Sequence, residues 1–228
     1  AHVVEKGFFG IDINSSPKPD FEDAGVELKV TPLTTTGGGE LLRPKERLVL
    51  CMVDYHNLVE ADHWRDVPEL EKKLTDMLII WYVHKDDSQR ADYPIVWVDL
   101  WEPDEEWSER FQEDFEILKE KVQEGCVPSE RYTEYLGTCP KHGGGYVKEN
   151  PEESPESAKV PPEAHPVLDH AEKRGWSISQ SGMMDLVLDS MGLEIASRGR
   201  SSGIEVSALE QKAREKGVGE FPGFGDLI

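Results

Sequence analysis

The sequence predicts an α/β fold in which a mixed β-sheet is flanked by helices. Three patterns support this prediction. Residues 77–83 form an uninterrupted apolar run of strand length, residues 26–30 alternate apolar and charged side chains, and residues 104–124 repeat apolar side chains at helical spacing. Strands of this kind bury their apolar faces against helices. With 228 residues, the chain is long enough to bury a sizeable core as one domain, or as one domain with two lobes.

The elements follow in a definite order. Residues 1–19 are expected as an irregular arm. The expected strands are residues 25–32, 46–55, 76–84 and 95–100, and the expected helices are residues 68–75, 104–124, 183–191 and 207–216. Asp104 is an N-cap residue for the long helix and Gly125 ends it. The Gly-rich residues 37–39 lack the Gly-Lys-Ser/Thr ending of a phosphate loop, so they are expected as a hairpin tip. Residues 143–166 are expected as a mobile loop.

The domain prediction places one domain at residues 1–195, followed by a C-terminal tail or linker at residues 196–228. No apolar run approaches the ~20 residues that a membrane span needs, and the N-terminus does not resemble a signal peptide. Three widely spaced cysteines favour reduced thiols in a cytoplasmic protein. Cys51 is expected in the core. Cys139 and His142 would form half of a zinc site, with Cys126 as a third ligand, but a tetrahedral site needs a fourth ligand and closer pairing.

The formal net charge of −21 excludes a uniformly basic nucleic-acid-binding surface. Much of the acid lies in residues 102–124 and 149–156, which can face away from DNA. The basic islands are Arg43, Lys45, Arg47, Lys141, Lys173 and Arg174. An acidic surface with such islands suits a host with high internal salt. The alternative is a protein that binds DNA weakly or not at all.

The segment from Asp20 to Lys29 has the residue types of a metal-dependent nuclease. Glu27 and Lys29 point to the same side of the predicted strand, and Asp20 follows a Pro-rich turn that can fold back beside Glu27. Two carboxylates and the Leu28 carbonyl would hold a hard divalent cation. Lys29 would orient the attacking water and offset negative charge on a phosphodiester. The plainer alternative is a solvated Glu-x-Lys ion pair.

A longer stretch resembles a known family. Asp20-Phe21 and Gly25-Val26-Glu27-Leu28-Lys29-Val30-Thr31-Pro32 are similar to the catalytic segment of the MutH family, which includes the mismatch-repair nicking endonuclease and the GATC-cutting type II restriction enzymes. The further similar segments are Lys6–Gly10, Arg43–Leu50, Trp101–Glu106, Tyr135–Cys139 and Arg174–Ser181. Two of them, Arg43–Leu50 and Trp101–Glu106, resemble the restriction-enzyme branch in particular.

The resemblance implies a restriction-endonuclease-like fold with two lobes around a DNA cleft. It also implies Mg²⁺ as the cofactor, for which Mn²⁺ can substitute, and double-stranded DNA as the partner. The implied catalytic residues are Asp20, Glu27, Lys29 and an auxiliary Lys73, whose alternative role is an ordinary cation at a helix end. The implied DNA-contacting residues are Arg47, Thr138, Lys141, Arg174, Ser179 and Gln180.

Two departures from the family pattern bear on activity. The chain is shorter between Gly10 and Asp20, where the family carries a helix with a further active-site Glu; neither Glu5 nor Asp12 stands at the matching offset. Ser179 stands where the family usually has a Lys. Three functions therefore remain open: a restriction-type GATC endonuclease, a mismatch-repair nickase that needs an activating partner, and a catalytically inert DNA-binding module. Cutting both strands of a palindrome would require a homodimer.

Overall fold

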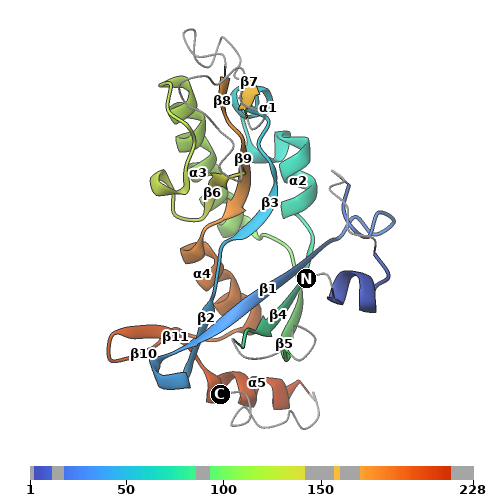
Figure 1. The fold of residues 1–228 in the computed structure, drawn as a ribbon, viewed down its shortest axis with the longest axis vertical. Coiled ribbons are helices and arrows are strands. Elements are labelled where there is room, and N and C mark those ends of the chain that lie inside the picture. Colours follow the sequence, from blue (N-terminus) through green and yellow to red (C-terminus); the bar gives the residue numbers. More distant parts are fainter. Residues whose placement is uncertain (1–2, 12–17, 86–92, 142–156, 160–169, 217–228) are drawn as a thin grey trace.

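The computed structural model describes residues 3–11, 18–85, 93–141, 157–159 and 170–216. Their elements form an elongated α/β molecule with two main sheets (Figure 1). The larger sheet has the strand order β10-β11-β2-β1-β4-β5, and the smaller has the order β3-β9-β6. Helices flank both, so the predicted fold class is confirmed. The predicted mobile loop at 143–166 lies outside the described residues except for residues 157–159.

The larger sheet is built around β1 (Glu27–Thr36), which pairs in parallel with β4 (Met77–Val83) and antiparallel with β2 (Leu41–Pro44). On the far side of β4, β5 (Ile95–Trp101) runs antiparallel. Strands β4 and β5 were predicted with nearly these bounds. Strand β2 was not predicted: the hairpin partner of β1 is this short strand, reached through the 3₁₀ turn η2 (Gly37–Gly39), and not the segment 46–55.

That segment instead supplies β3 (Leu48–Met52) to the smaller sheet. There β9 (Arg174–Ile178) lies between β3 and β6 (Leu136–Pro140), and all pairs are antiparallel. A separate two-stranded ribbon joins β7 (Ser157–Lys159) to β8 (His170–Glu172). The two predicted lobes, and a DNA cleft between them, stay predictions.

Helices follow where apolar periodicity and capping residues predict them. The predicted ones are α2 (Pro68–Leu74), α3 (Glu105–Gln123), α4 (Gln180–Met191) and α5 (Val206–Glu215), and unpredicted helices occur at η1 (Val3–Phe8), α1 (Tyr55–Glu60), η3 (Trp64–Asp66) and η5 (Glu130–Tyr132). The side chain of Asp104 caps α3 by accepting from the Trp107 amide at 2.9 Å. The short helix η1 shows that the arm at residues 1–19 is not irregular throughout.

A buried carboxylate joins α3 to the smaller sheet. Asp114 is only 5% exposed and accepts hydrogen bonds from three consecutive backbone amides, those of Glu134 (3.2 Å), Tyr135 (2.7 Å) and Leu136 (2.8 Å). These amides lead into β6. Burial raises the pKa of Asp114, although the three amide hydrogen bonds act in the opposite direction. Asp114 therefore fixes the start of β6 against the helix.

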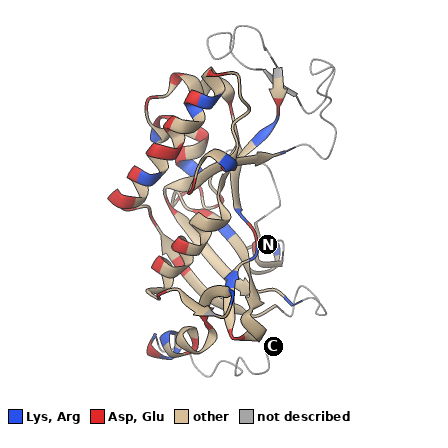
Figure 2. Cartoon of the chain, turned by 90° about the vertical axis from the view of Figure 1, so that its left-hand side faces the viewer, with Lys and Arg blue, Asp and Glu red and all other residues tan. Residues whose placement is uncertain are grey.

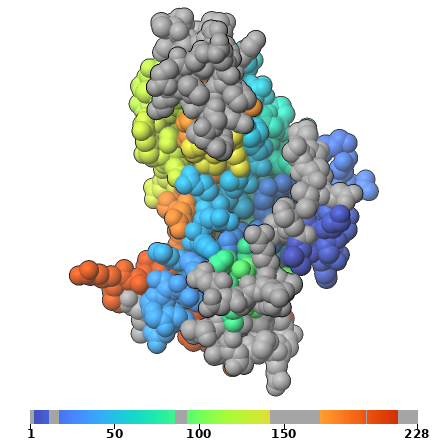
Figure 3. All heavy atoms as spheres, in the orientation of Figure 1, coloured from blue at the N-terminus to red at the C-terminus, as the bar shows by residue number. Residues whose placement is uncertain are grey.

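Residues 196–216, predicted to belong to a tail, pack on the same core. Strand β10 (Ala196–Arg198) forms a hairpin with β11 (Ser201–Glu205), which projects at the lower left of Figure 3, and β11 pairs with β2. Ile204 and Leu209 are fully buried. A side chain at Gly203 would lie 2.4 Å from the Leu42 carbonyl oxygen, so this position requires glycine. The division after residue 195 stays a prediction, but these residues complete the larger sheet.

The core lies between the strands and the helices, with large aromatic residues at its centre. Trp64, Trp81, Phe111 and Phe115 are completely buried, and the apolar stripe of α3 packs there as core, as its spacing predicts. Cys51 is half-buried at the edge of this core. Among the described residues, no helix is both long and apolar enough to cross a membrane.

Candidate active site

A tight turn brings Asp20 to the start of β1. Phe21 and Val26 pair across the turn, with hydrogen bonds from the Phe21 amide to the Val26 carbonyl (2.9 Å) and from the Val26 amide to the Phe21 carbonyl (3.3 Å). Gly25 adopts a φ of 71°, which other residues rarely adopt, and so allows the reversal. The Leu28 amide then donates to Asp20 Oδ2 at 3.1 Å. The chain thus folds back in the way that the Pro-rich turn predicts.

Glu27 is buried at the first position of β1 and lies between two lysines. Its Oε1 atom accepts from Lys29 Nζ and its Oε2 atom from Lys73 Nζ, each at 2.7 Å. The side chains of Glu27, Lys29 and Lys73 are 5%, 12% and 8% exposed. This is a buried ion triad and not the solvated Glu-x-Lys pair of the plainer alternative. We call these three side chains the Glu27 clamp.

Lys73 reaches the clamp because of the parallel pairing of β1 and β4. Glu27 is opposite Met77 in the register, and α2 ends just before β4, so Lys73 lies beside Glu27 although 46 residues separate them. The ammonium of Lys73 also donates to the Lys18 carbonyl at 2.6 Å. Lys73 therefore contacts both β1 and the segment that leads to Asp20. The alternative of an ordinary cation at a helix end does not include these two contacts.

The Lys18 carbonyl is a component of this site that sequence reasoning missed. It is a backbone group, so no residue-type pattern indicates it. The only available signal was its position two residues before Asp20 in the Pro-Lys-Pro-Asp turn.

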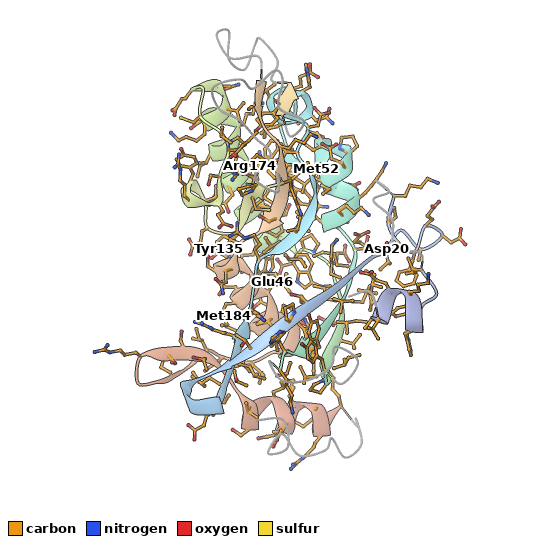
Figure 4. The ribbon with its side chains drawn as sticks, in the orientation of Figure 1. Asp20, Glu46, Met52, Tyr135, Arg174 and Met184 are labelled. Atoms are coloured by element: carbon orange, nitrogen blue, oxygen red, sulfur yellow. The ribbon has the colours of Figure 1, made fainter. Side chains whose placement is uncertain are left out.

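Burial and the neighbouring charge of Glu27 raise the pKa of the Asp20 carboxyl above its usual value. The Leu28 amide, Lys73 and Lys29 act in the opposite direction and reduce the shift. Figure 4 shows Asp20 at the N-terminal end of β1, at the edge of the molecule. Folding therefore favours the protonated form of this carboxyl, and a bound cation would favour the ionised form.

This shift predicts how Asp20→Asn changes stability. A carboxyl whose pKa is raised by folding costs stability once it ionises, so its unfavourable contribution grows as the pH rises through the raised pKa. We expect Asp20→Asn to raise the thermal midpoint at pH 8 in the absence of metal, with the gain shrinking as the pH falls toward 4. Calorimetry of both proteins across this range measures the gain. A gain that grows toward acid pH would contradict the prediction.

The donor set suits a hard divalent cation. Asp20 and Glu27 bring two carboxylates to one place, and the Leu28 carbonyl lies between Glu27 and Lys29 along the chain. Mg²⁺ typically takes one or two carboxylates and keeps water or phosphate oxygens in its remaining positions. Within the described part of the chain, no three His, Cys, Asp or Glu side chains form a metal cluster. That finding gives no support to the zinc alternative, of which Cys126 and Cys139 are described and His142 is not.

Two of the residues predicted to contact DNA are buried in contact with each other. Thr138 is fully buried, and Arg174 is 5% exposed. Arg174 donates from Nε to Thr138 Oγ1 (3.1 Å), from Nη2 to the Thr138 carbonyl (2.8 Å), and from Nη1 to Glu172 (2.7 Å). Figure 4 shows Arg174 in the upper part of the molecule, well separated from Asp20. This pair ties β6 to β9, so its burial does not favour the predicted DNA contact.

Of the other four residues predicted to contact DNA, one is a buried helix cap and three are partly or fully exposed. Ser179 is 5% exposed and caps α4 by accepting from the Gly182 amide at 3.0 Å. Arg47 pairs with Glu130 at 2.7 Å and is partly exposed. Lys141 and Gln180 are exposed. Gln180 Nε2 donates to the Pro44 carbonyl at 3.1 Å, which places Gln180 beside the exposed residues Arg43 and Lys45.

Comparison with protein families identifies the segment that carries the clamp. Residues 9–114 match the family model described as DNA mismatch repair enzyme MutH. This segment of the chain is similar to the MutH family. The matched segment contains Asp20 and all three residues of the Glu27 clamp. The resemblance in the catalytic motif is therefore supported by a match over a much longer stretch.

Two individual proteins are similar to this chain, one a restriction enzyme and the other a mismatch repair protein. The type II restriction enzyme Sau3AI of Staphylococcus aureus is 29% identical over 140 residues, which cover 60% of this chain and 28% of that protein. The DNA mismatch repair protein MutH of Shewanella sp. (strain MR-7) is 29% identical over 140 residues, which cover 58% of this chain and 57% of that protein. The matches span less than two thirds of the length of either relative.

Proposed function

We propose that this MutH-family chain is a Mg²⁺-dependent DNA endonuclease of the restriction type that cuts at GATC-like sites. The observation that carries the proposal is the buried Glu27, held by Lys29 and Lys73 beside Asp20 inside the matched segment. A buried Glu27 with two lysines bonded to it and a second, half-buried carboxylate nearby is costly to maintain for stability alone. Such an arrangement can hold a divalent cation and offset the negative charge that develops during hydrolysis of a phosphodiester.

In this proposal Asp20, Glu27 and the Leu28 carbonyl hold the ion. Bound there, Mg²⁺ supplies a polarised phosphoryl oxygen and a more acidic water. Lys29, whose side chain is 12% exposed, orients the attacking water and offsets charge that develops on the phosphate. Before the ion binds, Lys73 holds Glu27 and the Lys18 carbonyl together, which fixes the spacing of the donor set. By resemblance to the family, the products carry a 5′-phosphate and a 3′-hydroxyl.

Double-stranded DNA is the proposed partner, and local basic groups carry the contact. Arg43, Lys45 and Lys141 are exposed, and Gln180 lies next to the first two through its bond to Pro44. Gln can read adenine, and Lys or Arg can read guanine, in the major groove. Figure 2 shows the acidic residues concentrated on the helices, α3 above all, which leaves the strands less negative. Local patches are therefore able to bind phosphate despite the net charge.

The decisive test is incubation of unmethylated plasmid DNA with the protein and Mg²⁺ from low to high salt. Cutting at discrete sites that requires Mg²⁺, and that Lys29→Met abolishes, supports the proposal; the fragment ends give the recognition sequence. Nicking that needs an added repair protein would favour the nickase alternative. No cutting at any salt, with DNA binding retained, would show an inert module.

The pair between Arg47 and Glu130 predicts a gain in DNA affinity. Glu130 holds the Arg47 guanidinium at 2.7 Å and so competes with a phosphate for it. Arg47 and Glu130 are both partly exposed, and exposed pairs are worth roughly 0.2–1 kcal/mol. We therefore expect Glu130→Gln to tighten DNA binding about two- to fivefold at low salt. Fluorescence anisotropy without divalent ions measures this.

The matched control is Glu124→Gln, which removes one negative charge at the C-terminal end of α3 and breaks the exposed pair with Lys121. An equal gain in both variants would mean that only net charge matters. Loss of the gain in an Arg47→Met background would confirm that Arg47 carries it.

A further inference from the structure

One buried carboxylate oxygen close to the Glu27 clamp has no described partner. Glu69 lies in the first turn of α2 and is half-buried. Its Oε2 atom accepts from Asn57 Nδ2 at 2.9 Å. Its Oε1 atom is buried and has no hydrogen-bond partner among the residues that the structure describes. Because a buried acceptor without a donor costs stability, such an atom calls for a donor that arrives under other conditions.

The position of Glu69 points to that donor. Glu69 and Lys73 are four residues apart on α2, so their side chains leave the same face of the helix. A Glu that precedes a Lys by four residues is the favourable orientation for an ion pair on a helix. The surroundings of Cys51 agree: burial raises the pKa of its thiol to about 12, and Glu69, Lys29, Lys73 and Glu27 all act on it electrostatically. Glu69 and the three clamp residues therefore all lie within electrostatic range of the Cys51 thiol.

The clamp creates a need for such an acceptor. Lys73 Nζ lies 2.7 Å from Glu27 Oε2, an oxygen that is also a proposed ligand of the metal. A divalent ion bound there would lie close to the ammonium and repel it. Lys73 would then need another acceptor within reach, since a buried ammonium without a partner is costly.

We propose that Glu69 is a positioning residue of the metal centre, which accepts the Lys73 ammonium when a divalent cation occupies Glu27. In the metal-free protein Lys73 bonds to Glu27 and the Lys18 carbonyl; with metal, Lys73 turns along α2 to Glu69 Oε1 and leaves Glu27 to the ion. Glu69 thereby favours metal binding without contacting the metal. The inference rests on the proposed function and adds to it a residue that the catalytic motif does not contain.

The test measures Mn²⁺ binding to the full chain without DNA, by titration calorimetry. Glu69→Gln keeps the shape of the side chain and removes its charge, and we expect it to weaken Mn²⁺ binding about tenfold. Glu71→Gln is the matched control, because Glu71 lies in the same first turn but two residues further round the helix. It should leave the affinity unchanged, which excludes an effect of charge at the helix end.

Coupling to Lys73 completes the test. In a Lys73→Met background, Glu69→Gln should have no further effect on Mn²⁺ binding. An unchanged affinity in Glu69→Gln, or an equal loss with and without Lys73, would overturn the inference while leaving the proposed function intact. Absence of Mn²⁺ binding that depends on Glu27 would overturn the proposed function and this inference with it. Unchanged thermal unfolding of Glu69→Gln separates a loss of affinity from a damaged fold.

Discussion

Replacement of Glu27 by Gln is expected to lower the cleavage rate by at least about a thousandfold. The change removes a proposed ligand of the metal, and metal-ion catalysis contributes several kcal/mol to stabilising the transition state. It also leaves Lys29 and Lys73 without the carboxylate that both contact at 2.7 Å. Single-turnover cleavage of a plasmid at saturating Mg²⁺ measures the loss. Residual activity within tenfold of the unchanged protein would contradict Glu27 as the central ligand.

A second variant separates chemistry from folding. A buried ion pair that loses one partner costs about 3–5 kcal/mol of stability, because a charge remains uncompensated. Glu27→Gln combined with Lys73→Met removes one charge of each sign, so it should recover much of the lost stability but none of the activity. Urea unfolding compares the three proteins. Recovery of cleavage in the double variant would show that the single change acts through misfolding.

Replacement of Asp114 by Ala is expected to lower the free energy of unfolding by about 3 kcal/mol, because three backbone amides, one buried and two partly buried, lose a charged acceptor. These are the amides of residues 134–136, which bond to Asp114 at 2.7–3.2 Å. Loss of the bonds frees the start of β6, the strand that pairs with β9. Urea unfolding monitored by tryptophan fluorescence gives the difference.

Two variants accompany Asp114→Ala. Glu113→Ala, at the neighbouring and exposed position of α3, should change stability by no more than about 0.5 kcal/mol. Asp114→Asn keeps one acceptor oxygen and should lose less than Ala. Equal losses for Ala and Asn would mean that the charge, and not the number of acceptors, holds the amides.

Local patterns were sufficient to predict most elements. The apolar run at 77–83 has the length of a buried strand, and the stripe from Trp107 to Val122 has helical spacing. Asp104 marks the start of the helix because its side chain caps a backbone amide of the first turn. Strand β2 was missed because it has only four residues, one of them Pro44, and follows three glycines. Neither its length nor its composition distinguishes it from a loop; its place is determined by pairing with β1 and β11.

In the candidate site too, local sequence patterns predict some contacts, whereas others depend on how distant segments pair. Asp20, Glu27 and Lys29 lie within ten residues, so the turn and the strand alternation were enough to place them together. The contact of Glu27 with Lys73 depends on the register of β1 against β4, and Lys73 was suggested only by family resemblance. Thr138 and Arg174 are polar, and their residue types predict exposed positions. Instead, Arg174 donates hydrogen bonds to Thr138 inside the smaller sheet. Sequence does not distinguish a polar residue that faces DNA from one that joins two strands.

The pairing of β2 with β11 has a consequence for how the molecule folds. Residues 41–42 bond to residues 204–205, and β1 and β4 join segments 50 residues apart in parallel. Contacts between such distant segments form slowly, because the intervening chain must be ordered before the strands meet. Until β11 arrives, β2 is an open edge with Leu41 and Leu42 uncovered, and open apolar edges promote aggregation. The Glu27 clamp and the completed larger sheet are therefore expected to form late in folding. Conditions that slow folding should cause losses through aggregation before they affect molecules that have already folded.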